Sequence, residues 1–471
     1  MCDVTTSPPT ASRLAAFAVG LPAGEIPARV RENGVRHVLD TVGCGLAAAG
    51  IGEAGHAVAV AAAQGGRPEA SMLGRDTAVP AALAAFANGT LCHALDFDDT
   101  HEAGICHVST VVAPAALAVG EAREATGAQA LDAYLVGSEV ALRIALAAAD
   151  GLYARGFHPT PVCGAFGAAA AACRLLGATE EQCANALGVV GSFASGLFEY
   201  LSDGSATKPL HAGWAAQAGV QAALLAAEGA TGPATVLEGR FGLLASHTGE
   251  TNGAEAMCEG LGERWESAQI ALKAYPACHF AHASTWAAAE LAREHGLAPA
   301  DVAGIAVRVP DEGARLVLDP LPAKHAPATP YDAKFSLPFT IAHVLVHGEL
   351  GVASFSDEPI REPRVLDLAR LVGAEPWGPE RPPSRFAGAT RITTRTGAEL
   401  ELTVSHAPGS PANPLGDPWL LEKFRANAAL ALEGAAAASL AGRLLALDGT
   451  KRIAEVLAPA TGGVAARLDF N

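Results

Sequence analysis

The stretch "LDFDDTH", residues 95–101, carries three carboxylates within four positions: Asp96, Asp98 and Asp99. The surrounding sequence is mostly Ala, Leu and Val, and the basic side chains beside the carboxylates are histidines. Carboxylates at this density in apolar surroundings are typical of a metal site, of phosphoryl transfer by an aspartyl nucleophile, or of a buried polar site for acid–base chemistry. The neighbouring sequence discriminates among the three.

Residues 96–100 spell D-x-D-x-T, the pattern of aspartyl phosphatases, in which the first Asp attacks phosphorus beside a Mg²⁺ ion. That motif follows a buried parallel strand. Here the preceding "AALAAFANGTLCHA" is rich in alanine, which favours a helix over a strand. A Mg-dependent aspartyl phosphatase is therefore a remote alternative.

The spacing of the carboxylates also argues against a dedicated metal site. If the segment is helical, adjacent Asp98 and Asp99 point to different faces, and we expect no metal. For either residue alone, a helix-end charge or a buried hydrogen-bond acceptor is the simpler interpretation. Asp96 and Thr100 are spaced i, i+4, so they would share one helical face and present a carboxylate and a hydroxyl together.

Composition limits the partners of this chain. At 471 residues it exceeds one ordinary core, so two domains are expected. Half of the residues are hydrophobic, 17% are charged, and the net charge is -17. Binding to nucleic acid or to an anionic membrane depends on Lys and Arg, so we expect neither partner. A small anionic substrate remains compatible with this charge if a local cationic site receives it.

Cysteines and apolar runs predict the compartment. The nine cysteines form no C-x-x-C pair, which indicates a reducing, cytoplasmic environment. "RLAAFAVGL" near the N-terminus is expected to be an amphipathic helix, because Asp3 and the Pro8-Pro9 pair do not suit a signal peptide. The longest uncharged run, Pro209 to Ala227, contains His211 and two glutamines, so it is expected to be a buried helix rather than a membrane span.

Helical periodicity dominates the chain up to about residue 265. "IPARVRENGVRHVLDTVGCGLAAA" spaces its apolar residues along one stripe, "GAFGAAAAACRLLG" is apolar nearly all round, and strand patterns are missing. After Lys273 the pattern changes: "GIAVRVP" alternates, and "RITTRTGAELELTV" predicts a hairpin about Thr396-Gly397. A helical pattern returns in "WLLEKFRANAALAL".

We therefore predict a mainly α fold, in which a smaller α+β lid domain is inserted into a large all-helical domain. The helical domain is expected to comprise residues 1–270 and, after the insertion, residues 413–471. The lid domain is expected to comprise residues 271–412.

Several blocks of the sequence together resemble the MmgE/PrpD family, in the family's order and over most of the chain. They are "NGTLCHALDFDDTH", "CHVSTVVAPAALAVGE", "RGFHPTPVCGAFGAAAAACRLLG", "SGLFEYLSDGSATKPLHAGWAAQAG", "KAYPACHFAH", "DAKFSLPF" and "NPLGDPWLLEKF". Members of this family include 2-methylcitrate dehydratase, cis-aconitate decarboxylase and iminodisuccinate epimerase. The resemblance implies a helical domain with an inserted lid, a homodimer, no required metal or redox cofactor, and a site between the domains.

The resemblance also implies a set of site residues, each matched to a position of this sequence. The residues expected to bind substrate are Thr100, Lys273 and His279. Of the two histidines in "CHFAH", we favour the second for catalysis, because it falls on the family's usual histidine. The residues expected to be catalytic are Asp96, His107, His158, Lys208 and His282.

Lys208 has support from the sequence itself, because it is the first lysine of the chain and every earlier Lys or Arg position is Arg. Lysine is a compact charge whose pKa shifts readily on burial, and Arg does not replace it as a point cation. Lys273 is similarly scarce and could grip a substrate carboxylate. For His107 and His158, the alternative is a buried histidine that satisfies a hydrogen bond in the core.

The reactions of the family share one chemical problem, a carbanion-like centre next to a carboxylate. Histidine can move the proton near neutral pH, and fixed cations can hold the growing negative charge. We expect lysines and histidines to hold a small di- or tricarboxylate, His107 or His282 to move the proton, and Asp96 to orient a histidine or a substrate hydroxyl.

The resemblance implies a cofactor-independent lyase, either a dehydratase or a decarboxylase. The alternative on the same scaffold is an epimerase of an amino- or imino-dicarboxylate, and a non-enzymatic role is also open. The sequence departs from many relatives in reading "CHVST" after Ile105, Pro209 after Lys208, and Phe339 where relatives often carry Tyr. The loss of an Arg and of a phenol changes the donors of the site but does not separate the reactions.

Overall fold

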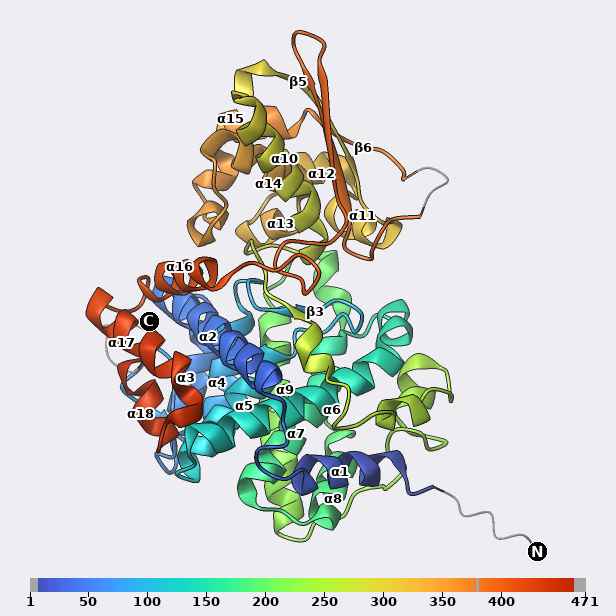
Figure 1. Ribbon diagram of the computed structural model, residues 1–471, viewed down its shortest axis with the longest axis vertical. Helices are drawn as coiled ribbons and strands as arrows, with labels where there is room; N and C mark the ends of the chain where they lie inside the picture. Colours follow the sequence, from blue (N-terminus) through green and yellow to red (C-terminus); the bar gives the residue numbers. More distant parts are fainter. Residues whose placement is uncertain (1–6, 378–380, 461–471) are drawn as a thin grey trace, which may run out of the picture. The chain divides into compact units, whose positions relative to one another are not determined.

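The computed structural model describes residues 7–377 and 381–460 and divides into two compact units (Figure 1). The helical unit comprises the residues up to Ala94, Asp98–Ile270, and the residues from Asp417 onward. The α+β unit comprises Leu95–Phe97 and Ala271–Gly416. The mainly α fold class is confirmed, because helices account for most of the described secondary structure.

The helical unit is built from long helices of the first half of the chain and from shorter helices near its end. Those of the first half are α1 (Thr10–Gly20), α2 (Ala28–Ile51), α3 (Gly55–Gln64), α4 (Ala81–His93), α5 (Ser109–Ala122), α6 (Gly127–Ala154), α7 (Pro159–Leu176), α8 (Glu180–Val190) and α9 (Lys208–Ala227). Those near the end are α16 (Asp417–Ala428), α17 (Gly434–Leu445) and α18 (Ile453–Leu457).

Small residues let the central helices of this unit approach closely. An added Cβ at Gly137 of α6 would lie 2.5 Å from the backbone oxygen of Gly167 on α7. An added Cβ at Gly213 of α9 would lie 2.3 Å from the backbone oxygen of Phe86 on α4. Neither distance tolerates a side chain, so the alanine- and glycine-rich sequence is what allows α4, α6, α7 and α9 to pack as they do.

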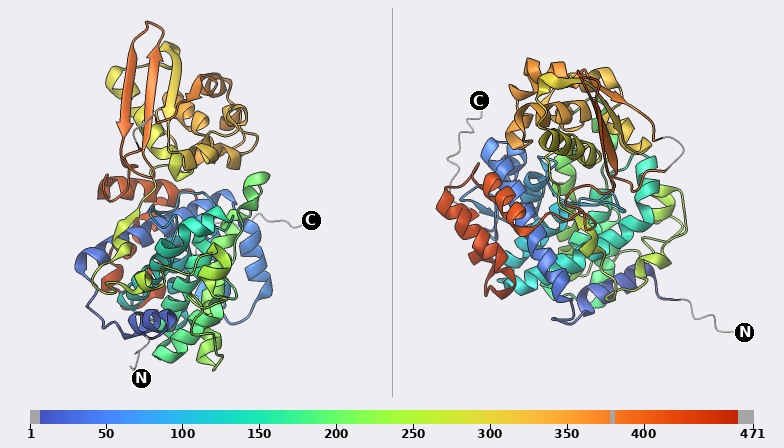
Figure 2. Two further views of the ribbon diagram at one scale, coloured as in Figure 1. Left: turned by 90° about the vertical axis from the view of Figure 1, so that its right-hand side faces the viewer. Right: turned by 45° about the horizontal axis from the view of Figure 1, so that its top comes forward.

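The α+β unit is organised around a four-stranded sheet with the strand order β6-β5-β7-β8. Strand β5 pairs in parallel with β6 and antiparallel with β7, which pairs antiparallel with β8. Helices cover one face of the sheet (Figure 2, left). The strands are β5 (Val302–Arg308), β6 (Val372–Ala374), β7 (Gly388–Thr394) and β8 (Glu399–Val404). The helices are α10 (His282–His295), α11 (Asp311–Val317), α12 (Leu321–His325), α13 (Pro330–Lys334), α14 (Leu337–His347) and α15 (Pro363–Ala369).

Several local predictions are confirmed. The alternating "GIAVRVP" forms β5, with Ile305 and Val307 buried. The hairpin turns at Thr396-Gly397, where Gly397 has φ of 84°, a left-handed conformation that glycine adopts without strain. The expectation that strands are missing before residue 265 is wrong in detail, because two-residue strands β1 (Ala70–Ser71), β2 (Ala78–Val79) and β3 (Thr100–His101) are present.

The expected domain ranges, 1–270 with 413–471 and 271–412, remain a prediction about folding units. The compact units differ from them in two places. The tripeptide Leu95–Phe97 belongs to the α+β unit although it lies within the first helical range. The return to the helical unit falls at Asp417, just after the predicted position. A short strand, β4 (Ile270–Ala271), lies at the junction where the insertion begins.

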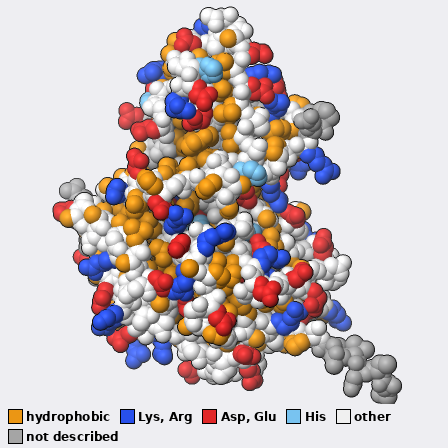
Figure 3. Space-filling model, viewed as in Figure 1, with side chains coloured by type: hydrophobic (Ala, Val, Ile, Leu, Met, Phe, Trp, Pro, Cys, Tyr) orange, Lys and Arg blue, Asp and Glu red, His pale blue; other side chains and the backbone are white. Residues whose placement is uncertain are grey.

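The described surface and helices bear on the predicted partners. On the face seen in Figure 3, Lys and Arg are interspersed with Asp and Glu. Within residues 7–377 and 381–460, no single helix is long and apolar enough to cross a membrane. Among the described helices, α2 and α3 reach that length and apolarity when taken together, but they are bent by 91° to one another.

Candidate functional site

The acidic stretch is not helical, so the predicted shared face of Asp96 and Thr100 is wrong. Helix α4 ends at His93, and Thr100 lies in β3. Asp96 has φ of 54°, in the left-handed region, which a right-handed helix cannot contain. Asp96 belongs to the α+β unit, and Asp98 to the helical unit. The stretch therefore distributes its carboxylates between the two units.

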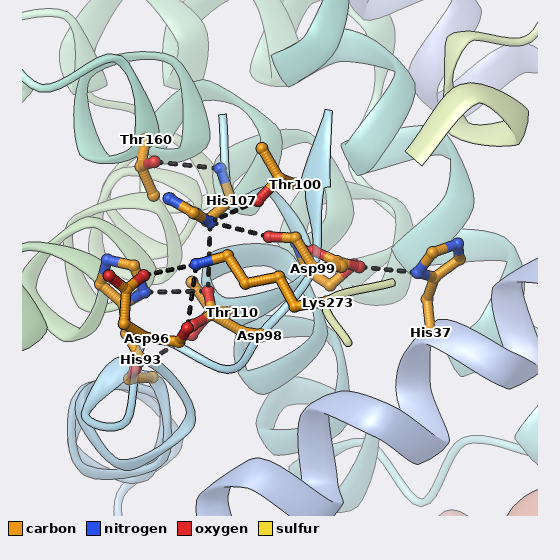
Figure 4. Close-up of polar contacts among 12 residues, drawn as sticks. His37, His93, Asp96, Asp98, Asp99, Thr100, His107, Thr110, Thr160 and Lys273 are labelled. Carbon is orange, nitrogen blue, oxygen red and sulfur yellow. Dashed lines mark hydrogen bonds and ion pairs between the residues drawn. The ribbon is translucent and has the colours of Figure 1, made fainter. Parts of the chain in front are cut away.

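Asp98 orients an imidazole that the sequence did not single out. Nδ1 of His93 lies 2.8 Å from Oδ2 of Asp98, and both side chains are completely buried (Figure 4). Because an ionised carboxylate only accepts hydrogen bonds, we assign the proton to Nδ1 of His93. Nε2 then keeps its lone pair, and it has no hydrogen-bond partner among the described residues. His93 is thus a proton acceptor held by a buried carboxylate.

His107 has its tautomer fixed in the same way. Its Nδ1 lies 2.8 Å from the backbone oxygen of Asp99 and 3.1 Å from Oγ1 of Thr100 (Figure 4). A carbonyl oxygen can only accept, so Nδ1 of neutral His107 carries the proton and Nε2 is the basic nitrogen. Oδ2 of Asp98 lies 3.7 Å from Nδ1 and would stabilise the ring when it is protonated. These contacts are those of a general base.

Asp99 is a buried acceptor that holds this arrangement in place. Its carboxylate lies 2.8 Å from Nδ1 of His37 and accepts a hydrogen bond from the hydroxyl of Ser109. The hydroxyl of Ser109 lies 2.6 Å from that of Tyr134 on α6. Side chains from α2, α5 and α6 thereby fix Asp99, whose backbone oxygen in turn orients His107.

His158 stands at the start of α7, against the other histidines of the helical unit. Its ring centroid lies 5.8 Å from that of His93, 6.2 Å from that of His107 and 5.5 Å from that of His211. Burial lowers the pKa of His158 well below its usual value, and the charge of Lys208 lowers it further. His158 is therefore a neutral imidazole at neutral pH.

Lys208 supplies positive charge to this group of rings. It begins α9 and is buried, with His211 in the same helical turn. Burial first, and then the charges of His93 and Lys208, lower the pKa of His211 to about 4. The ammonium of Lys208 therefore keeps the neighbouring imidazoles of His158 and His211 neutral and places a positive charge beside them.

In the α+β unit, Lys273 is paired with Asp96. Nζ of Lys273 donates to Oδ1 of Asp96 at 2.5 Å and to the backbone oxygen of Asp96 at 2.9 Å (Figure 4). The side chains are 0% and 1% exposed, so each ion compensates the other in a place that water does not reach. The predicted grip of Lys273 on a substrate carboxylate would be shared with Asp96 and stays a prediction.

His279 and His282 lie together at the start of α10. Nε2 of His282 lies 3.1 Å from the backbone oxygen of Ala277, so its proton is assigned to Nε2. Its Nδ1 is buried without a hydrogen-bond partner among the described residues, and burial lowers its pKa well below the usual value. The ring of His279 lies 4.9 Å away and against Phe386. Both histidines are buried, and the preference for His282 stays a prediction.

Two of the atoms that could bind a metal ion in the helical unit already have partners. Oδ2 of Asp98 and Nδ1 of His107 are 3.7 Å apart, but the first accepts from His93 and the second donates to the backbone of Asp99. An ion there would have to displace these bonds. The expectation that no metal is required stays a prediction.

The helical unit thus brings together four of the predicted site residues, and the α+β unit holds the other four. The first group is Thr100, His107, His158 and Lys208. The second is Asp96, Lys273, His279 and His282. His93 and His211 were missed. His211 is three residues after Lys208 on one helix face, a spacing that could have revealed it.

The contacts within the helical unit define a class of site. Imidazoles that are buried or partly buried, each held by a carboxylate, a carbonyl or another imidazole, lie beside a buried lysine. Such an arrangement is chemically suited to acid–base chemistry on an anion. The MmgE/PrpD N-terminal domain matches residues 12–255, and the MmgE/PrpD C-terminal domain matches residues 275–445. The chain belongs to the MmgE/PrpD family.

The chain is also similar to curated members of that family. It is 31% identical to the cis-aconitate decarboxylase of Homo sapiens over 425 residues, which cover 87% of this chain and 85% of the relative. It is 30% identical to that of Mus musculus, over 87% of this chain and 84% of the relative. With the cis-aconitate decarboxylase of Aspergillus terreus it shares 26% identity over 92% of each chain.

Proposed function

We propose that this chain is a lyase that removes carbon dioxide from a small tricarboxylate of the cis-aconitate type. The observation that carries the proposal is the pair of imidazoles that stay neutral beside the buried Lys208, buried His158 and partly buried His211. Three relatives that match most of the chain are named cis-aconitate decarboxylase, and these names support the same reaction.

The geometry supplies what this reaction needs. When carbon dioxide leaves, the electron pair of the broken C–C bond stays on carbon, and a proton must then form the new C–H bond. Nε2 of His107 is basic in the neutral ring, so once protonated it can donate that proton. Lys208 would hold a carboxylate of the substrate and offset the charge that develops. The substrate carries negative charge throughout the reaction. Because the protein is itself acidic, a local cation is needed to bind such a substrate.

The same residues are compatible with dehydration, and this second candidate is favoured by one observation. The ring of His93 is oriented by Asp98 as a base, and dehydration begins with proton abstraction next to a carboxylate. Epimerisation of an amino- or imino-dicarboxylate needs two opposed proton carriers and is the third candidate.

Incubation in D₂O with cis-aconitate, 2-methylcitrate and aminodicarboxylates, followed by NMR, separates these reactions. Decarboxylation releases carbon dioxide and leaves one deuterium on the product carbon. Dehydration yields a new alkene. Epimerisation incorporates deuterium from the solvent into the substrate that is recovered. Carbon dioxide release from cis-aconitate by the wild-type chain, and its loss in His107→Ala, is the expected result. If the chain converts 2-methylcitrate and none of the other compounds, the proposed function becomes dehydration and decarboxylation is rejected.

We further propose that the enzyme works as a cytoplasmic homodimer without metal or redox cofactor. The eight cysteines in the described ranges are buried and none is in a disulfide, which suits a reducing compartment. Light scattering at several protein concentrations tests the dimer, and dialysis against EDTA followed by an activity assay tests metal independence.

A further inference from the structure

Two histidines of the helical unit are joined by a direct contact between their rings. Nδ1 of His158 lies 3.2 Å from Nδ1 of His211, so one ring donates and the other accepts. The two residues differ in access to water. His158 is 3% exposed, whereas His211, in the first turn of α9, is only partly buried. The contact therefore connects a buried imidazole with one that water can reach.

The proposed reaction makes this connection necessary. Decarboxylation consumes one proton in each turnover, since the carbon that loses carbon dioxide gains hydrogen. A buried imidazole that gives up a proton must receive another proton before the next turnover. His158 is enclosed by the rings of His93, His107, His211 and Phe198, and of these histidines His211 has the greatest access to solvent.

We propose that His211 relays protons from solvent to His158, through the contact between their Nδ1 atoms, to replace the proton consumed at the reacting carbon. This inference rests on the proposed decarboxylation. His211 is a relay residue that acts through His158 and does not touch the substrate.

The transfer balances with the rings of His158 and His211 neutral at the start and at the end. Protonated His107 gives its Nε2 proton to the carbanion left by carbon dioxide, and Nε2–H of His158, whose ring centroid lies 6.2 Å from that of His107, gives its proton to Nε2 of His107. Nδ1 of His158 takes the proton of Nδ1–H of His211, and Nε2 of His211 takes a proton from water. Both rings then carry their proton on the other nitrogen. Between turnovers, when exchangeable water fills the site, the reverse transfers restore the first tautomers.

The charges around His158 and His211 favour rapid transfer of a proton between the rings and disfavour a ring that stays protonated. Lys208, His93 and His107 face His158, and Lys208, His93 and the ring of Tyr200 lie near His211. Burial and these charges lower the pKa of both histidines. An excess proton is thus not retained by either ring at neutral pH, which is the property that a relay needs.

The test compares His211→Ala with His247→Ala, a matched control. His247 is also a partly buried histidine of the helical unit, and it lies against Phe157 and outside the group of site rings. We expect kcat for carbon dioxide release to fall roughly 100-fold in His211→Ala, the scale of a lost proton-transfer group, with KM little changed. We expect the solvent deuterium isotope effect on kcat to rise and added imidazole to restore turnover. His247→Ala should show none of these effects.

Three outcomes overturn the relay. The first is that His211→Ala has the kcat of wild type. The second is that kcat falls in His211→Ala and added imidazole does not restore it. If His211→Ala melts at a lower temperature, His211→Gln, which keeps a hydrogen bond to His158, is measured in its place. Wild-type kcat or an unchanged isotope effect in that folded variant is the third. No carbon dioxide release by the wild-type chain would instead overturn the proposed function.

Discussion

The carboxylate of Asp98 accepts a hydrogen bond of 2.8 Å from Nδ1 of His93, and neither side chain is reached by solvent. The pair is separated by only five positions, yet it forms across the turn that ends α4. A buried carboxylate fixes the tautomer of the ring that it contacts and stabilises that ring when it gains a proton. Asp98 therefore prepares His93 to accept a proton through Nε2.

Asp98→Asn should reduce kcat without unfolding the helical unit. The amide fills the same volume but carries no charge to stabilise protonated His93, and its NH₂ group can favour the wrong tautomer. By analogy with other carboxylate–imidazole pairs, we expect a loss of roughly 100-fold or more in kcat. Steady-state kinetics and thermal melting measure the two effects separately. Asp203→Asn, at an exposed position of the same unit, is the control, and equal kinetics for both variants would contradict this role.

Lys208→Met should change the protonation of its neighbours as well as substrate binding. The charge of Lys208 contributes to the lowered pKa of His158 and of His211, so its removal should raise both pKa values. NMR titration of the histidine ring protons measures this shift from about 4 upward for His211. We also expect KM to rise, because the substrate loses a cation.

Two further variants separate the charge of Lys208 from its shape. Lys208→Arg keeps the charge but introduces a planar fork that does not fit the place of a compact ammonium, so turnover should stay low. Lys451→Met, at an exposed position, should leave KM and the histidine titrations unchanged. Wild-type histidine titrations in Lys208→Met would contradict the influence of the lysine on these rings.

The elements that the sequence predicted well are those with a strong local signal. The alternation in "GIAVRVP" and the Thr396-Gly397 turn specify β5 and the hairpin without help from distant residues. The family blocks also pointed to His107, His158 and Lys208, which the structure places in one group of side chains.

The errors arose where distant residues decide the backbone. Local propensity continues α4 through the acidic stretch, but Asp96 turns to positive φ and binds Lys273, 177 positions away. No pattern of helical or strand periodicity contains such a contact. The pairing of His93 with Asp98 depends on that same departure from the helix, and it was hidden for the same reason.

Acid should weaken folding through the histidines of the helical unit. The folded pKa of His211, about 4, lies below its usual value of 6.5, so between these pH values the unfolded chain binds more protons. Stability contributed by neutral His211 is thus complete above pH 6.5 and is lost as the pH falls. At about pH 5.5, roughly 1.4 kcal/mol should be lost per such histidine. The pKa of His158 is lowered in the same direction.

Urea denaturation of wild type and His211→Gln at about pH 7.5 and about pH 5.5 measures this contribution by difference. The glutamine does not titrate, so the variant should gain roughly 1.4 kcal/mol relative to wild type on acidification. His56→Gln, at an exposed position of α3, should show no such gain. A difference between His211→Gln and wild type that does not change with pH would contradict the lowered pKa.

Variants of the buried pair of Lys273 and Asp96 distinguish an effect on stability from an effect on catalysis. Lys273→Met should lower the free energy of unfolding by roughly 3–5 kcal/mol, because it leaves the carboxylate of Asp96 buried without its cation. Adding Asp96→Asn removes that charge and should recover much of the loss. Arg370→Met, which breaks an exposed pair with Asp367 in the same unit, should cost less than about 1 kcal/mol.

Turnover in the double variant then decides what Lys273 does. If Lys273 grips a carboxylate of the substrate together with its structural pairing, the double variant should be nearly as stable as wild type and still have a raised KM. Urea denaturation and kinetics on the same preparations give both quantities. Recovery of KM along with stability would mean that the pair only supports the backbone around Asp96. That support is itself substantial, because the ammonium of Lys273 also holds the backbone oxygen of Asp96 at a residue with positive φ.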